Sequence, residues 1–308
     1  MARDDNGPSA LRLRAPGCAR DVRQQTSVAA ELPFFNDAAM AQRLIETGLD
    51  PLLRHIPANC RLADFGGADG FLAQAIRNHL EQRGIRATAV VVDANAASLA
   101  VAQRRGLRIV PASLEHVRLS SVHLVVMRLV LHYNGLEAQS RILAHAFHCL
   151  APGGYLLLQA EAGERGSAVF RNLLVRALER FGASNAPEAG CRWLSTEALE
   201  RLARRRDYEI MMTRDDIFVF ETRLSDLLRL SWTRFHGTPD TNENSRRQYA
   251  SFCDYANVLA GRMMQRRSTT GLRINSAGEI RFVSRHALIV ARKPVTGIRQ
   301  HPGIGEAT

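Results

Sequence analysis

The sequence has no long apolar run. The longest one, Val122 to Leu131, is interrupted by His123 and Arg128, whereas a helix that crosses a bilayer needs about 20 predominantly apolar residues. A membrane-spanning segment is therefore excluded. The first 27 residues mix arginine with aspartate, glycine and proline and lack the apolar middle part of a secretory signal. We therefore expect residues 1–30 to form a mobile N-terminal tail.

Cysteines are few and scattered. The chain has five, and none of them belongs to a CxxC pair. An odd number without paired spacing fits reduced thiols better than disulfides or a zinc site. These observations predict a cytoplasmic protein without a bound metal.

Lysine is almost missing. Of the 41 basic residues only Lys293 is a lysine, and the formal net charge is +11. So strong a bias toward arginine favours GC-rich coding as the origin of the charge, over selection for one binding face. The alternative is a basic surface for nucleic acid, because phosphates are bound largely through arginine and lysine.

Strand-like and helix-like patterns alternate along the chain, after one or two expected helices within residues 34–56. Strands are expected at residues 61–65, 88–93, 108–111, 122–131, 155–159, 208–213 and 284–291, and helices at 71–80, 96–105, 136–150, 169–181 and 195–205. This order predicts an α/β fold with a doubly wound, mostly parallel seven-stranded sheet and helices on both faces.

A long insert separates the last two expected strands. It is rich in aromatic and methionine residues, and a structureless loop of that length is improbable in a compact domain. We therefore expect residues 218–283 to form a helical cap, inserted before the last strand, over one end of the sheet. The core then comprises residues 31–217 and a last strand at 284–293, followed by a tail at 294–308.

A glycine turn follows the first expected strand, in the run Asp64-Phe65-Gly66-Gly67-Ala68-Asp69-Gly70, and Asp93 closes the second strand. In open α/β sheets, ligands bind beyond the carboxyl ends of the strands. Glycines there let the backbone approach a ligand closely, and a carboxylate can accept hydrogen bonds from two ribose hydroxyls. The pair indicates an adenosine-containing ligand. A nicotinamide dinucleotide is the alternative, but its usual Gly-x-Gly-x-x-Gly spacing is absent.

The run from Leu62 to Phe71 resembles the first motif of class I S-adenosylmethionine-dependent methyltransferases, commonly written acid-x-Gly-x-Gly-x-Gly, and departs from it at Ala68. The likeness continues over Val90–Asp93 and His123–Tyr133 and ends at Leu150–Leu158, similar to the motif that follows the core in that family. Four ordered matches over about a hundred residues are more specific than any one of them.

The resemblance implies S-adenosylmethionine as cofactor. Asp64, Gly66, Gly67 and Gly70 would border its methionine part, Asp93 its ribose, and Ala94 its adenine. Many relatives carry an acidic residue after the third strand, where this chain has Pro111-Ala112-Ser113-Leu114, so Ser113 or the backbone would take that place. Arg128 is a further candidate at the cofactor.

Methyl transfer from a sulfonium is an in-line displacement that needs alignment and exclusion of water. Whether a base is also needed depends on the acceptor atom. The candidate catalytic residues are His132 after the fourth strand, Arg128 at its end and Glu161 at the end of the fifth. A satisfied core histidine and a strand-end ion pair are the alternatives for His132 and Arg128.

The insert resembles the cap of small-molecule methyltransferases, and its aromatic residues would wall an apolar pocket. Candidate substrate-binding residues are Tyr133, Trp232, Arg234, Tyr249 and Tyr255; for those of the cap, a place in its helix core fits equally well. The sequence favours methyl transfer to a small molecule, in secondary metabolism, by a monomer or homodimer. RNA or protein as acceptor, and a non-catalytic binding protein, are the alternatives.

Overall fold

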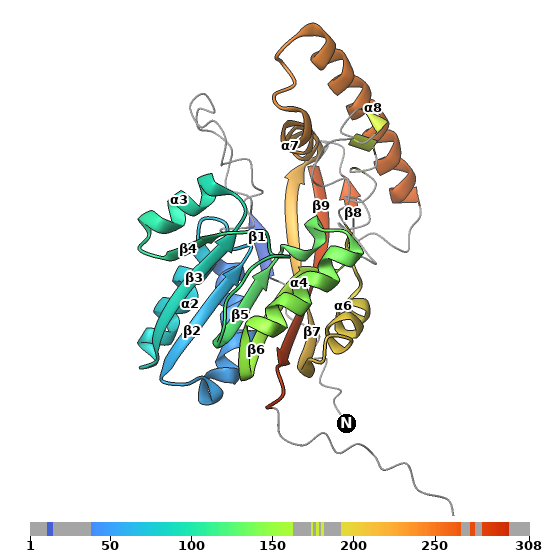
Figure 1. The fold of residues 1–308 in the computed structure, drawn as a ribbon. Helices are drawn as coiled ribbons and strands as arrows, with labels where there is room; N and C mark the ends of the chain where they lie inside the picture. Colours follow the sequence, from blue (N-terminus) through green and yellow to red (C-terminus); the bar gives the residue numbers. More distant parts are fainter. Residues whose placement is uncertain are drawn as a thin grey trace, which may run out of the picture.

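The computed structural model describes residues 11–14, 38–162, 174, 177–178, 180–181, 192–265, 272–274 and 279–295. Their strands form one sheet in the order β1-β7-β9-β6-β5-β2-β3-β4, with β8 paired to β9 (Figure 1). Seven of these strands correspond to the predicted core, and β1 and β8 are short additions. The predicted α/β class with a mostly parallel core sheet is confirmed.

The parallel half of the sheet winds in two directions from its centre. On one side run β2 (Asn59–Phe65), α2 (Phe71–Gln82), β3 (Arg86–Asp93), α3 (Ala96–Arg104) and β4 (Arg108–Pro111). On the other side run β5 (Val122–Arg128), the short helix η3 (Leu131–Tyr133), α4 (Leu136–Cys149) and β6 (Leu150–Glu161). Because β2 and β5 are neighbours, the crevice where ligands bind in such sheets lies beyond their carboxyl ends.

Two further strands, β9 and β7, complete the core sheet beyond β6. The strand β9 (Glu279–Arg292) pairs antiparallel with β6 and with β7 (Glu209–Arg223). Before β7 comes α6 (Thr196–Arg204), which Ser195 caps because its hydroxyl accepts a hydrogen bond from the Ala198 amide at 3.1 Å.

Apolar residues bury both faces of the sheet. On one face they pack with α1 (Ala38–Leu44), η1 (Ile45–Leu49), η2 (Asp50–His55), α2 and α3. On the other face they pack with α4 and α6. The carboxyl edge of the strands is thereby held between two cores.

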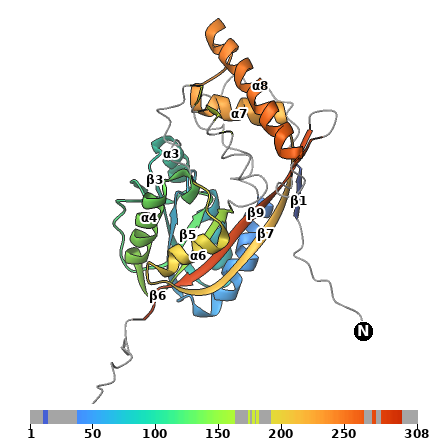
Figure 2. The ribbon, with the colours of Figure 1, turned by 90° about the vertical axis from the view of Figure 1, so that its right-hand side faces the viewer.

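The cap consists of α7 (Leu224–His236) and α8 (Glu243–Gln265), followed by β8 (Leu272–Ile274). Figure 2 shows that β7 and β9 extend beyond the rest of the core and that both helices lie past the ends of this extension. The cap has its own apolar cluster, and this cluster includes Met40 of α1 and Leu129 after β5. Leu129 therefore joins the cap to the crevice.

Strand lengths differ from those predicted at the edge of the sheet. β7 continues to Arg223 and β9 begins at Glu279, so both strands enter the predicted insert of residues 218–283. Asp215 and Asp216 have the polarity of a loop, yet both lie within β7, where arginines pair with them. In the predicted tail, β1 (Leu11–Arg14) pairs in parallel with β7.

Two predicted segments fall largely outside the described residues. These are the helix at residues 169–181, of which five residues are described, and the tail after residue 295. Among the described residues, no helix has the length and apolar character needed to cross a membrane.

Candidate functional site

The glycine turn lies between β2 and α2 and bends sharply over the end of the sheet. Gly66 and Gly70 have φ of +71° and +77°, and Ala68 has +45°. The turn is tied down at Gly66, whose amide donates to the Val92 carbonyl of β3 at 2.7 Å. A Cβ at Gly66 would meet the Val130 side chain, and one at Gly67 would lie 2.6 Å from the Asp64 carboxyl. Only glycine therefore fits at these two positions.

Asp93 reaches from the end of β3 to this turn. Its Oδ2 accepts a hydrogen bond from the Ala68 amide at 3.0 Å, and its Oδ1 accepts one from the Asn95 amide at 2.8 Å. The carboxylate is thus fixed in orientation and stays partly exposed to the crevice. Asn95 in turn caps α3 by accepting from the amides of Ala97 and Ser98.

Asp64 and Arg128 form the buried charged floor of the crevice. Asp64 is 2% exposed, and Arg128, at the end of β5, is 8% exposed. Burial raises the pKa of Asp64 from 3.8 to about 7, although the positive charge of Arg128 opposes this shift. A carboxyl that is half protonated near neutral pH, with its Oδ2 unbonded among the described residues, is a feature typical of binding and catalytic sites.

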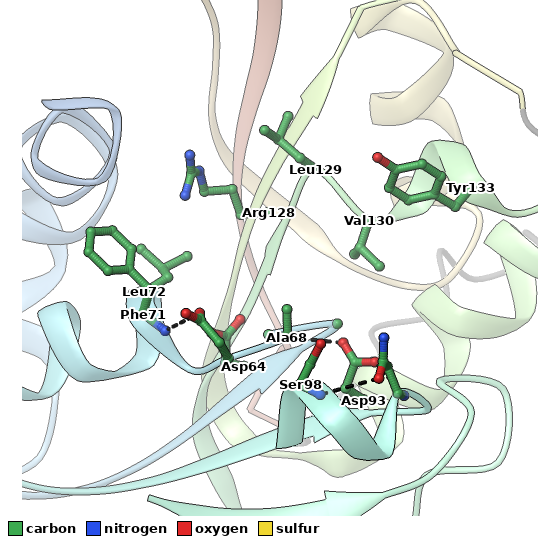
Figure 3. Close-up of a pocket in the computed structure, with 14 residues that line it drawn as sticks. Asp64, Ala68, Phe71, Leu72, Asp93, Ser98, Arg128, Leu129, Val130 and Tyr133 are labelled. Atoms are coloured by element: carbon green, nitrogen blue, oxygen red, sulfur yellow. Dashed lines mark hydrogen bonds between the residues drawn. The ribbon is translucent and has the colours of Figure 1, made fainter. Parts of the chain in front are cut away.

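A pocket of about 230 Å³ opens over these residues (Figure 3). The candidates predicted from the sequence that line it are Asp64, Gly66, Gly67, Asp93, Arg128 and Tyr133. Residues that the sequence did not single out complete the lining: Ala68, Asp69, Phe71, Leu72, Asn95, Ser98, Leu129 and Val130. The structure therefore brings three separated chain segments, residues 64–72, 93–98 and 128–133, to one cavity.

Some signals for the missed residues were present in the sequence. Asn95 and Ser98 lie just after Asp93, where an Asn before a helix pattern is a typical N-cap. Leu129 gives no such signal, because its φ of +54° is uncommon for leucine and depends on tertiary contacts.

Other predicted cofactor residues lie outside the pocket lining. Gly70 is buried behind the turn, where an added Cβ would meet Leu107 of the core. Ala94 and Ser113 are exposed, and the Ser113 hydroxyl accepts a hydrogen bond from the Glu115 amide at 3.4 Å.

His132 does not line the pocket either. It is 4% exposed, and its ring stacks on Trp193 at 5.2 Å between centroids and contacts Tyr133 at 4.1 Å. This placement corresponds to the alternative interpretation of His132 as a core histidine.

Glu161 belongs to a second buried group, which the sequence did not reveal. Across the sheet it is in register with His286 of β9, which is in register with Asp216 of β7. Register partners project on the same face, and the three are 2%, 3% and 2% exposed. Asp216 also pairs with Arg214 at 3.0 Å and with Arg43 of α1 at 3.5 Å. We call Glu161, His286 and Asp216 the acid–base row.

The acid–base row adjoins the pocket. Gln159 precedes Glu161 by two residues on the same face and is in register with Arg128, a residue of the pocket lining. A buried polar path therefore leads from Asp64 and Arg128, across Gln159, to the row.

The cap candidates lie in the cap's own core. Trp232 is fully buried and stacks on His236 with 4.1 Å between ring centroids, while Tyr249 and Tyr255 pack partly buried in the same cluster. The backbone of Arg234 belongs to α7, and its side chain is outside the described part. None of the four lines the described pocket.

The pocket has the features that a nucleoside sulfonium needs. The backbone of Gly66 and Gly67 lines the pocket, and a fixed carboxylate can accept from two ribose hydroxyls. A buried carboxyl and an apolar wall of Leu129 and Val130 border the same space. No group of three or more histidine, cysteine or acidic side chains suited to hold a metal occurs within the described ranges.

Comparison with known proteins agrees with this geometry. A family described as a methyltransferase domain matches residues 37–212, more than half of the chain. No curated protein sequence matches.

Solved structures share the fold at low identity. A Bacillus halodurans protein described as a methyltransferase is 15% identical, with a TM-score of 0.56 over 83% of this chain and 99% of that one. The Bacillus subtilis protein YcgJ is 17% identical, with a TM-score of 0.51 over 80% and 97%. The cyclopropane synthase MmaA2 from Mycobacterium tuberculosis is 14% identical, with a TM-score of 0.50 over 82% and 83%. At such identity the likeness shows the fold alone.

Proposed function

Since the chain belongs to the methyltransferase-domain family and uses S-adenosylmethionine as methyl donor, we propose that it methylates a small molecule. The observation that carries this proposal is the enclosure of the acid–base row. Glu161, His286 and Asp216 are each no more than 3% exposed and adjoin the donor pocket through Gln159 and Arg128. Groups as buried as these would be accessible to a small acceptor that reaches them from the donor pocket, whereas an RNA or protein side chain would need an open approach.

The donor supplies an electrophilic methyl group. Asp93 would accept hydrogen bonds from the ribose hydroxyls, and the Gly66–Gly67 backbone would border the remainder. Leu129, Val130 and Tyr133 line the same pocket and would keep water away from the reacting atoms.

The acid–base row suits an acceptor that must lose a proton, such as a hydroxyl or an amine. His286 lies between two carboxylates in the strand register, so it can take up a proton while Glu161 and Asp216 stabilise the positive charge. Arg43 and Arg214 pair with Asp216 and orient that carboxylate. In this proposal Glu161 takes part in the proton transfer and His132 does not.

A macromolecular acceptor is the second candidate, because the net charge is +11. Many described arginines, however, face a carboxylate: Arg105 pairs with Asp69 at 2.8 Å, Arg141 with Glu115 at 2.5 Å and Arg204 with Glu200 at 2.8 Å. These pairs reduce the positive potential available to phosphates.

The test gives the purified chain a donor labelled in its methyl group, with three separate acceptor pools: metabolites below about 3 kDa, RNA and protein. We expect label in the metabolite pool. Glu161→Gln should lower the rate about a hundredfold or more, as expected for loss of acid–base assistance, with S-adenosylhomocysteine affinity unchanged. Glu209→Gln, on the exposed side of β7, is the control. Label in RNA or protein alone would refute the small-molecule proposal.

A further inference from the structure

A short segment, Arg192 to Leu194, lies across the turn that carries Tyr133 into the donor pocket. The Arg192 amide donates to the His132 carbonyl at 2.8 Å. The next residue, Trp193, places its ring against the His132 ring, with 5.2 Å between centroids and 15° between planes. Neither Arg192 nor Trp193 lines the pocket, so their influence on it passes through His132 and Tyr133.

Gln139 of α4 fastens this segment to the turn. Its side-chain amide donates to the Asn134 carbonyl at 2.8 Å and to the Arg192 carbonyl at 2.7 Å. Gln139 is 1% exposed, and lost hydrogen bonds at buried carbonyls are costly. The amide therefore joins the end of the turn and the crossing segment into one rigid unit.

The turn needs such support. It follows Leu129, whose φ of +54° is a left-handed conformation that is strained for leucine. The helix η3 that comes next has three residues and no side-chain cap. Strained backbone of this kind persists where surrounding contacts hold it. The Leu129 amide donates to the Gln159 carbonyl at 2.8 Å, and Trp193 and Gln139 hold the turn that follows, at His132 and Asn134.

We propose that Trp193 is a positioning residue for the donor pocket. By stacking on His132, it holds Tyr133, whose ring lies 4.1 Å from that of His132, in the orientation that closes one wall of the pocket. Figure 3 shows Tyr133 beside Val130, with its hydroxyl directed toward Leu129. The inference rests on the donor pocket of the proposed function and is independent of the acceptor.

Trp193 could act through the face of its ring or through a hydrogen bond from its indole N–H. Trp193 Nε1 is buried and has no hydrogen-bond partner among the residues that the structure describes. The ring face, and not the N–H, is therefore what the site uses. Phenylalanine should replace tryptophan here with little loss, whereas alanine should not.

The experiment uses S-adenosylhomocysteine as probe and the intrinsic fluorescence of the chain. The sequence has two tryptophans, Trp193 and Trp232, so Trp232→Phe leaves Trp193 as the single reporter. We expect S-adenosylhomocysteine to change the Trp193 emission, with a midpoint equal to the Kd that calorimetry gives for the same variant. Unchanged emission at saturation would overturn the inference.

Affinity supplies the second measurement. In the otherwise native chain, Trp193→Phe should keep the S-adenosylhomocysteine Kd within about threefold, and Trp193→Ala should weaken it about tenfold at a temperature well below the unfolding midpoints of both. A lower midpoint with an unchanged Kd for Trp193→Ala would show a structural role alone and overturn the inference. Failure of the native chain to bind the probe would instead overturn the donor pocket itself.

Discussion

Asp64 is a buried carboxyl at the floor of the proposed donor pocket, and its protonation state affects the stability of the folded chain. Burial raises its pKa from 3.8 to about 7. Between these two values the folded chain holds a proton that the unfolded chain has released. The contribution of Asp64 to stability is therefore largest below pH 4 and falls as the pH rises toward 7.

Asp64→Asn replaces this group by a neutral one of the same shape. We compare the thermal unfolding midpoints of the variant and the native chain without ligand. The variant should gain several degrees relative to the native chain between pH 5 and pH 8, because only the native chain bears a buried charge at pH 8. Thermal unfolding measured at both pH values tests this. Asp226 is exposed on α7, so the midpoint of Asp226→Asn should differ from that of the native chain by the same amount at both pH values. Equal differences for Asp64→Asn would contradict the shifted pKa.

Single residues were predicted best where chain position alone determines placement. Asp93 and the glycines lie at strand ends, and parallel strands bring their carboxyl ends to the same edge, so the sequence located them. His286 and Asp216 escaped notice because only the pairing of β9 with β6 and β7 brings them beside Glu161. Register between strands far apart in the chain is not encoded in any local pattern.

At the scale of elements, the turn between β2 and α2 depends on the absence of side chains. Gly66 and Gly84 both have positive φ, of +71° and +77°, but their surroundings differ. A Cβ on Gly66 would meet Val130, whereas nothing lies within 4 Å of one on Gly84. A substitution at Gly84 would therefore test backbone strain alone, whereas one at Gly66 would add a steric conflict.

Gly84→Ala should lower the free energy of unfolding by about 1 kcal/mol, the cost of left-handed backbone for alanine. Gly66→Ala should lower it by a further 1–3 kcal/mol or so, because it also overpacks the turn, and it should weaken binding of S-adenosylhomocysteine. Urea unfolding gives the first quantity and calorimetry the second. The double variant Gly66→Ala, Val130→Ala should recover part of the stability; equal losses for Gly66→Ala and Gly84→Ala would refute the steric account.

Most elements of the parallel core were predicted within a few residues, since each has a clear apolar period. β6 is the exception, because it begins at Leu150, five residues before the predicted strand, and runs through Pro152, Gly153 and Gly154. The length of β7 was underestimated because the polarity of Asp215 and Asp216 is that of a loop. Asp215 is satisfied by Thr196 at 2.6 Å and Arg285 at 3.1 Å, partners distant in the sequence. Tertiary ion pairs thus overrule the local signal for a turn.

At the scale of the molecule, the cap is stabilised by an apolar cluster of its own. Trp232, Phe252 and Ala256 are fully buried in it, and Leu129 connects the cluster with the donor pocket. The sequence predicted the cap and its aromatic content, but it could not tell a pocket wall from a helix core, because both need apolar side chains at helical spacing.

Phe252→Ala should therefore lower the free energy of unfolding by about 3–5 kcal/mol, through the cavity left in the cluster. Val258→Ala on the same helix α8, where the side chain is 51% exposed, should change it by less than about 0.5 kcal/mol. Chemical denaturation of both variants checks the contrast. A small loss for Phe252→Ala would mean that the cap contributes little to the cooperative unit.

The long hairpin of β7 and β9 has a consequence for how this protein can diverge. Changes in length between the two strands, among the helices that they carry, leave every pairing below them intact. One extra residue between His286 and Leu288 would instead turn His286 to the opposite face of the sheet, away from Glu161. The cap is therefore free to change in length, while insertions of odd length in the strands beneath it should be purged.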